Sequence, residues 1–184
     1  MIMQYILDGL YILKGSIFRG LIIYLLILVV LYLTKKRRTF KVNHIVPEIL
    51  LSIYTIALLK ITGIIGIKFH FGYVMSGMYN LNLIPFQDAS IMMVVLNFIL
   101  FVPYGILLPF VFNSLRFSYK RVIIIGFMTS LSIEALQLFG GRYAEIDDLL
   151  INSLGTYIGF MIFRYIINKI LKNDKFIKGC DSSV

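Results

Sequence analysis

The chain has few charged residues, which make up only 15% of its 184 positions. Soluble domains carry about 25% charged residues, so this scarcity excludes an ordinary water-soluble globule. The single cysteine, Cys180, excludes an intramolecular disulfide and leaves the redox compartment open. Apolar residues make up 59% of the sequence, which excludes a disordered chain. These proportions predict a small polytopic membrane protein, with residues 1–184 in one membrane domain.

Acidic residues are scarce, at 9 against 18 Lys and Arg. The basic residues cluster at the ends of apolar runs, where they orient a membrane protein and contact anionic lipid, so we expect no nucleic-acid partner. GxSxG, HExxH, CxxC and P-loop motifs are absent, and no spacing of carboxylates demands a metal. We therefore expect no metal and no cofactor, and a non-enzymatic role rather than catalysis. Residues 1–15 lack the basic start and the cleavage site of a signal peptide.

Five apolar runs are present, and each is long enough to cross a bilayer, which takes about 20 apolar residues. They cover residues 17–34, 45–64, 91–113, 122–139 and 149–168. An isolated run can cross lipid only as a helix, so the predicted fold is an all-α bundle of about five transmembrane helices. Before the first run, apolar residues mix with Asp8 and Lys14. That mixture predicts a helix at the membrane interface over residues 5–14, rather than a sixth crossing.

Basic and non-basic connections alternate along the chain. Basic side chains follow the first run, separate the third from the fourth, and end or follow the fifth: Lys35, Lys36, Arg37, Arg38 and Lys41; Arg116, Lys120 and Arg121; Arg164, Lys169, Lys172, Lys175 and Lys178. Residues 69–90 contain no Lys or Arg, and residues 140–148 contain one arginine against three acids. Cytoplasmic loops are the basic ones, so we expect the amino terminus outside and the carboxyl terminus in the cytoplasm. His44 and His70 then lie on opposite sides and cannot share a metal.

Three runs place a polar side chain at a similar depth below their outer ends. At a rise of 1.5 Å per residue, Asn97, Glu134 and Asn152 lie roughly 9, 7 and 6 Å deep. Polar groups in hydrocarbon are expensive and mark functional sites. The predicted ligand-binding residues are Asn97, Glu134, Gln137, Arg142, Asp147, Asp148 and Asn152. A purely structural alternative remains open, in which Arg142 and the acids hold the connecting loop and Gln137 and Asn152 join the helices.

The last two runs each carry a stripe of polar and small residues at helical spacings of three and four. The stripes are Gly126, Ser130, Glu134 and Gln137 in the fourth run, and Asp148, Asn152, Gly155 and Gly159 in the fifth. We predict that they face each other, with Glu134 near Asn152. Gly155 and Gly159 form a GxxxG element, which allows two helix backbones to approach closely.

The order of these residues follows a known pattern. Glu134 and Gln137 precede Arg142, the acidic run 145–148, Asn152 and the two glycines; earlier, Asn97 precedes Phe101, Pro103 and Gly105, and residues 82–86 read Asn-Leu-Ile-Pro-Phe. Over about residues 80–160 the chain resembles the VanZ-like family of bacterial membrane proteins. It departs from the pattern at Glu145, where an aspartate is usual.

The resemblance implies a multi-pass protein of the bacterial cytoplasmic membrane, in a Gram-positive cell envelope. The family's name-giving member raises resistance to teicoplanin, a lipid-tailed glycopeptide antibiotic, without altering the peptidoglycan precursor. The leading hypothesis is a protein that lowers susceptibility to such lipoglycopeptides at the outer face. Its expected partners are the lipid bilayer and either a lipoglycopeptide or a lipid-linked wall precursor, and an oligomer stays open. The alternative is an intramembrane enzyme or a transporter that handles a lipid head group through Glu134, Arg142 and Asp148.

Overall fold

The computed structural model describes residues 2–33, 42–69, 75–77, 80–86 and 90–181. Within these ranges, the side chains of residues 2–6, 32, 42–44 and 171–181 are not described. The basic segment 35–41, His70 and part of the loop over residues 69–90 therefore lie outside the described residues. The same holds for the side chains of His44, Lys172, Lys175, Lys178 and Cys180.

The described residues form helices almost throughout. The elements in chain order are α1 (Ile2–Leu33), α2 (Val42–Ile61), β1 (Leu81–Asn82), α4 (Ile91–Val111), the short 3-10 helix η1 (Asn113–Leu115), α5 (Tyr119–Phe139), β2 (Ala144–Glu145) and α6 (Ile146–Asp181). The start of α5 is capped by Ser118, whose side chain accepts a hydrogen bond from the backbone N–H of Arg121. Such a bond satisfies one of the amides that a helix leaves open at its start.

Four helices among the described residues are long and apolar enough to cross a membrane. They are Leu7–Leu31 within α1, Ile91–Val111 (α4), Tyr119–Phe139 (α5) and Ile146–Ile170 within α6. The protein is therefore an all-α polytopic membrane bundle, as the sequence predicts. Helix α2 carries Pro47 and Lys60 and is not among these four, so a crossing at residues 45–64 stays a prediction.

Residues 5–14, for which we expect an interfacial helix, are helical but do not form a helix of their own. These residues belong to α1, which runs without a break from Ile2 to Leu33. The segment contains no proline, and single glycines such as Gly9 and Gly15 cost a helix only about 1 kcal/mol each. Helix α6 likewise continues to Asp181, well beyond the apolar run that ends at residue 168. The apolar run predicts which part of a helix contacts lipid. It does not predict where the helix itself ends.

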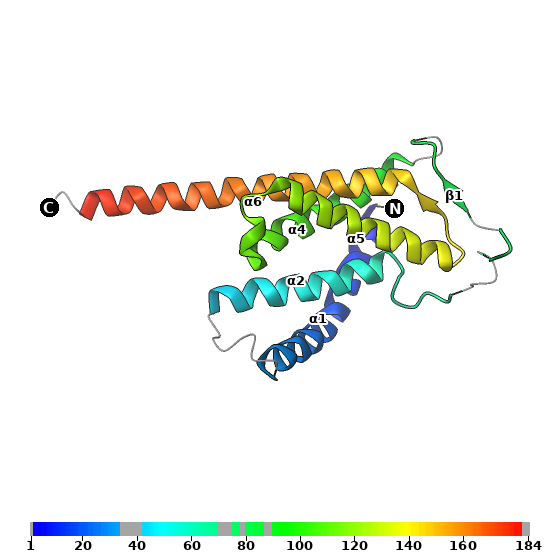
Figure 1. Ribbon diagram of the computed structural model, residues 1–184, viewed down its shortest axis with the longest axis horizontal. Helices are drawn as coiled ribbons and strands as arrows, with labels where there is room; N and C mark the ends of the chain where they lie inside the picture. Colours follow the sequence, from blue (N-terminus) through cyan, green and yellow to red (C-terminus); the bar gives the residue numbers. More distant parts are fainter. Residues whose placement is uncertain (1, 34–41, 70–74, 78–79, 87–89, 182–184) are drawn as a thin grey trace.

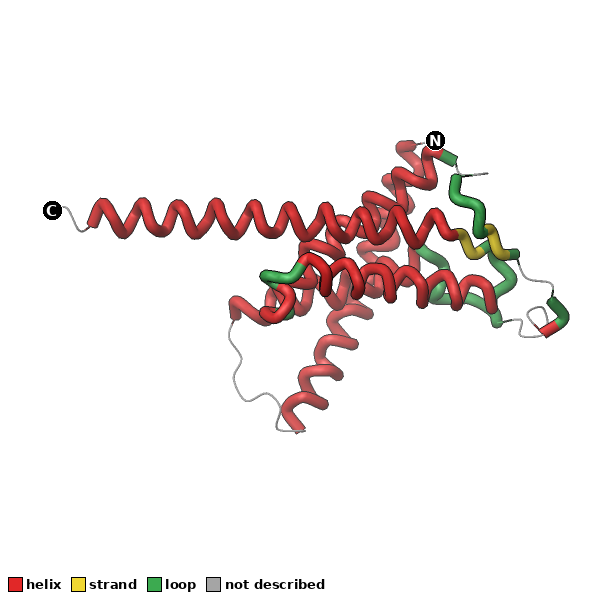
Figure 2. The backbone as a smooth tube through the Cα atoms, turned by 45° about the horizontal axis from the view of Figure 1, so that its top comes forward, coloured by secondary structure: helices red, strands yellow, loops and turns green. Residues whose placement is uncertain are grey.

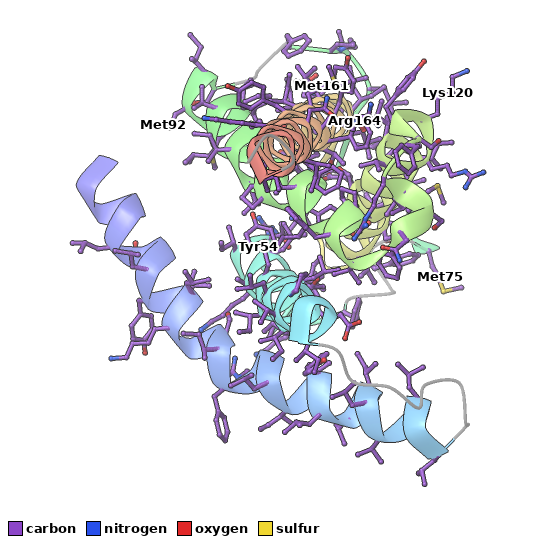
Figure 3. The ribbon with its side chains drawn as sticks, turned by 90° about the vertical axis from the view of Figure 1, so that its left-hand side faces the viewer. Tyr54, Met75, Met92, Lys120, Met161 and Arg164 are labelled. Carbon is purple, nitrogen blue, oxygen red and sulfur yellow. The ribbon has the colours of Figure 1, made fainter. Side chains whose placement is uncertain are left out.

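Helix α6 lies at the centre of the packing, beside both α4 and α5, while α2 packs on α4 and α1 packs mainly on α2 (Figures 1 and 2). The buried core between these helices is aromatic and aliphatic, and includes Leu58, Phe101, Val122, Phe160 and Phe163. Tyr54 of α2 points toward α4 in Figure 3 and donates a hydrogen bond to the carbonyl oxygen of Leu100.

Glycines let α4 and α6 approach each other closely. A Cβ on Gly155 would lie 2.5 Å from the carbonyl oxygen of Phe98, and one on Gly159 would overlap the carbonyl oxygen of Val102. On the facing helix, a Cβ on Gly105 would overlap the carbonyl oxygen of Thr156. The two backbones are therefore in direct contact, and α4 is the partner of the GxxxG element.

Two short strands close one end of the bundle. β1 and β2 pair in parallel, with Leu81 beside Ala144 and Asn82 beside Glu145. They join the segment before α4 to the connection between α5 and α6. In Figure 1 this end lies on the right, and the connection between α4 and α5 and the end of α6 lie on the left.

Candidate functional site

Glu134 is buried near the end of α5, beneath the paired strands. Only 5% of its surface is exposed, and its Oε2 accepts a hydrogen bond of 3.0 Å from the backbone N–H of Glu145. Among the described residues, the charged groups of Glu145, Asp148 and Arg142 act on it electrostatically. The carboxyl group thus sits at the junction of α5 with β2, with two further carboxyl groups and one guanidinium around it.

Asp148 lies in the first turn of α6 and is bonded to α4. The side-chain amide of Asn97 donates a 2.5 Å hydrogen bond to its Oδ1. An acidic side chain is favoured at this position, because the positive end of the helix dipole lies there. Asn97 and Asp148 are 51 residues apart in the sequence, so this bond links the two parts of the chain that carry the family pattern.

Asp147, the neighbouring acid, contacts the loop before α4 instead. Its two carboxylate oxygens accept the backbone N–H of Phe86 at 2.9 and 3.0 Å. Phe86 has a φ of 59°, a left-handed conformation that is uncommon for a residue other than glycine. Asp147 is itself buried. It therefore holds the loop before α4 against the start of α6.

Arg142 and Gln137 converge on the end of α2. Arg142 Nη1 and Gln137 Nε2 donate hydrogen bonds of 2.7 and 2.8 Å to the carbonyl oxygen of Thr62. Gly63, which follows Thr62, has a φ of 76°, and a Cβ there would overlap Nη1 of Arg142. The sequence suggests that Arg142 pairs with an acid, but the hydrogen bond that it makes goes to a main-chain carbonyl. No side-chain pattern indicates Thr62, because its backbone provides the acceptor.

Asn152 lies one turn below Asp148 and faces α5. Its Nδ2 donates a 2.8 Å hydrogen bond to Oγ of Ser130, and Ser130 Oγ donates a weak 3.4 Å bond to the carbonyl oxygen of Asp148. Asn152 is only 4% exposed, and its Oδ1 has no hydrogen-bond partner among the described residues. The stripe on α6 is therefore divided, because Asn152 faces α5 and the glycines face α4. The hydrogen-bond partner of Asn152 is Ser130 and not Glu134.

The structure brings the predicted residues to one end of the bundle but gives them different contacts. Glu134 and Asn152, which are buried, and Asp148 and Asn97, which are half-buried, form a cluster between α4, α5 and α6, which we call the acidic cluster. Arg142, Gln137 and Asp147 tie the surrounding segments to it. Within the described residues, no group of three or more His, Cys, Asp or Glu side chains could hold a metal ion.

These features define a class, namely polytopic membrane proteins with a buried acidic site at one end of the helix bundle. A family model described as VanZ/LLP1 matches residues 18–169. Since this match covers most of the 184 residues, the chain belongs to the VanZ/LLP1 family. No curated protein and no solved structure matches it.

Proposed function

We propose that the protein binds a hydrogen-bond-donating amphiphile at the outer face of the bacterial cytoplasmic membrane. By this binding it lowers susceptibility to teicoplanin-type lipoglycopeptide antibiotics without catalysis. Membership of the VanZ/LLP1 family supports the connection to teicoplanin, since the family's name-giving member acts on susceptibility to that drug. The acidic cluster supports the binding role.

The observation that carries the proposal is the charge balance of the acidic cluster. Within the part of the chain that the structure describes, two further carboxyl groups, those of Glu145 and Asp148, act on Glu134 electrostatically against a single guanidinium, that of Arg142. Among the described residues, Glu134 receives its hydrogen bond on Oε2, which leaves Oε1 for a ligand. A cationic or donor-rich group relieves such an excess of negative charge, whereas a phosphate adds to it.

The distribution of basic residues over the two ends of the bundle supports action at the outer face. The acidic cluster lies at the end where β1 and β2 pair, and the basic connection between α4 and α5 lies at the other end (Figure 1). Basic connections stay in the cytoplasm, and this supports an orientation in which the acidic cluster opens outward. An antibiotic that acts on the cell wall arrives from that side.

The test is expression in a susceptible Gram-positive host, followed by measurement of the lowest inhibitory concentrations of teicoplanin and vancomycin. We expect a rise for teicoplanin. Glu134→Gln should abolish this rise because it removes the carboxylate, and Arg142→Ala because it releases Thr62 and the end of α2 from the site. The amount of protein in the membrane should stay level in both variants. Glu48→Gln is the matched control, because it neutralises a carboxylate about 20 Å away along α2 and should keep the full effect. Full activity in Glu134→Gln would contradict the proposed site.

A second candidate function is an intramembrane enzyme or transporter for a lipid head group or a lipid-linked wall precursor. The free Oε1 of buried Glu134 favours it, since a general base needs an oxygen within reach of the proton that it removes. Arg142 and Asp148 would then position the head group. Incubation of the purified protein with lipid-linked wall precursor, followed by product analysis, separates catalysis from binding.

A further inference from the structure

A cavity of about 330 Å³ lies between α1, α2 and the end of α4. Aliphatic side chains make up most of its wall, among them Leu28 and Leu31 of α1, Leu51 of α2 and Val111 of α4. Glu48 also lines it, and 14 residues separate Glu48 from Thr62 of the functional site. That spacing is about 21 Å along a helix, so the cavity is a separate feature at the opposite end of the bundle.

The cavity exists because α1 meets the rest of the bundle at one crossing point. A Cβ on Gly20 would lie 2.6 Å from Cα of Ile53, so α1 and α2 touch there through their backbones. Toward its ends, α1 diverges from the rest of the bundle (Figure 3). Ile23 and Ile27 line the cavity and are 38% and 48% exposed, so the cavity opens toward the lipid-facing surface of α1.

The polar side chains in the wall are already used within the protein. Tyr24 donates a 2.9 Å hydrogen bond to Oε2 of Glu48, and Ser52 donates one of 2.9 Å to the carbonyl oxygen of Gly20. Thr55 donates to a carbonyl oxygen of its own helix. A polar ligand would therefore lose its hydrogen bonds to water without gaining comparable ones from the wall. An apolar ligand has no such hydrogen bonds to lose.

We propose that this cavity binds an acyl chain of a phospholipid from the surrounding bilayer. The acyl chain enters between α1 and the end of α4, and it covers aliphatic side chains that none of the described helices covers. Phospholipid is the partner because α1 and α4 are both long and apolar enough to cross the membrane, so the opening faces the hydrocarbon of the bilayer. Filling an apolar void with an aliphatic chain restores the dispersion contacts that the void lacks.

Retention of added lipid by the purified protein tests this site. The full chain is freed of lipid in detergent, mixed with palmitoyl-oleoyl-phosphatidylglycerol and examined by native mass spectrometry. We expect one tightly retained phospholipid on the parent protein and its loss in Leu28→Trp, which fills the cavity. Leu26→Trp is the matched control, because Leu26 is 60% exposed on the same helix and should leave retention unchanged. Equal retention by the Leu28→Trp protein and the parent would overturn the proposal.

A second measurement uses the unmodified protein, so it does not depend on the folding of a variant. A phospholipid with a photoreactive group in its acyl chain should crosslink preferentially to residues 23–31 and 48–56. Excess unlabelled phospholipid should abolish this crosslinking, and the deacylated head group should not. Even labelling of all lipid-facing surfaces would overturn the proposal.

Discussion

The side-chain amide of Asn97 donates its hydrogen bond to Oδ1 of Asp148, and this bond connects the middle of α4 to the first turn of α6. A hydrogen bond to a charged group contributes about 1.5–3 kcal/mol. We therefore expect Asn97→Ala to lower the free energy of unfolding by about that amount, because it leaves the Asp148 carboxyl without its donor. Thermal unfolding in detergent measures the change.

The control for this bond is Asn113→Ala, which removes the same side chain from an exposed position in η1 and should leave stability unchanged. A double-mutant cycle with Asp148→Ala isolates the pair, since bonded residues couple by about 0.5–3 kcal/mol. Additive effects of the two substitutions would show that the bond contributes nothing.

The contact of Gly159 with α4 predicts that even a methyl group is not tolerated there. In an open helix, Gly→Ala is stabilising by about 1 kcal/mol, but a Cβ on Gly159 overlaps the carbonyl oxygen of Val102. We expect Gly159→Ala to destabilise the protein by about 1–3 kcal/mol, the usual cost of overpacking. Gly9→Ala is the control, because a Cβ on Gly9 has no atom within 4 Å. Equal melting temperatures for the two variants would refute the close packing.

The position of Gly63 predicts an effect on Arg142. Gly63 and Gly66 have φ angles of 76° and 101°, so alanine at either position is strained by about 1–3 kcal/mol. Only the Cβ of Gly63→Ala also displaces the Arg142 guanidinium from Thr62, since Gly66 has open space. We expect Gly63→Ala to reduce teicoplanin tolerance as Arg142→Ala does, and Gly66→Ala to reduce stability alone. Antibiotic tolerance and thermal unfolding of both variants distinguish these effects.

The proposed orientation predicts which positions an impermeant thiol reagent reaches on intact cells. The native Cys180 is first replaced by serine, and single cysteines are then introduced at Arg37, Asn82, Tyr143 or Lys175. Cysteines at Asn82 and Tyr143 should be labelled, because they belong to the end of the bundle that we place outside. Those at Arg37 and Lys175 should react only after the cells are permeabilised. Labelling of intact cells at Arg37 would place the acidic cluster in the cytoplasmic half.

The helices of the fold are largely predictable because each apolar run must satisfy its own backbone within lipid. The start of α4 at Ile91 and the end of α5 at Phe139 coincide with the limits of their apolar runs. The sequence does not predict that α1 is continuous. The charged side chains of Asp8 and Lys14 interrupt the apolar run, but they do not break the helix. The pairing of β1 with β2 is also missed, since two residues per strand are too few to show an alternating pattern.

The residue types of the site are predictable, and their partners are not. Polar side chains inside apolar runs identify Glu134 and Asn152, because burial of such groups demands compensation. Their actual partners are the backbone N–H of Glu145 and the hydroxyl of Ser130, which side-chain chemistry alone does not reveal. The division of the α6 stripe between α4 and α5 depends on where each helix lies, and spacing along one helix contains no such information.

The length of α6 has a mechanical consequence. Its 36 residues form a rod of about 54 Å, against about 30 Å for the hydrocarbon core, and no proline interrupts it. The acidic first turn with Asp148 and the carboxyl-terminal end thus belong to one uninterrupted helix, so movement of one end displaces the other. A tilt of about 5° at the first turn would move the far end by about 5 Å, so we expect a ligand that displaces Asp148 to shift the carboxyl-terminal end of α6 as well.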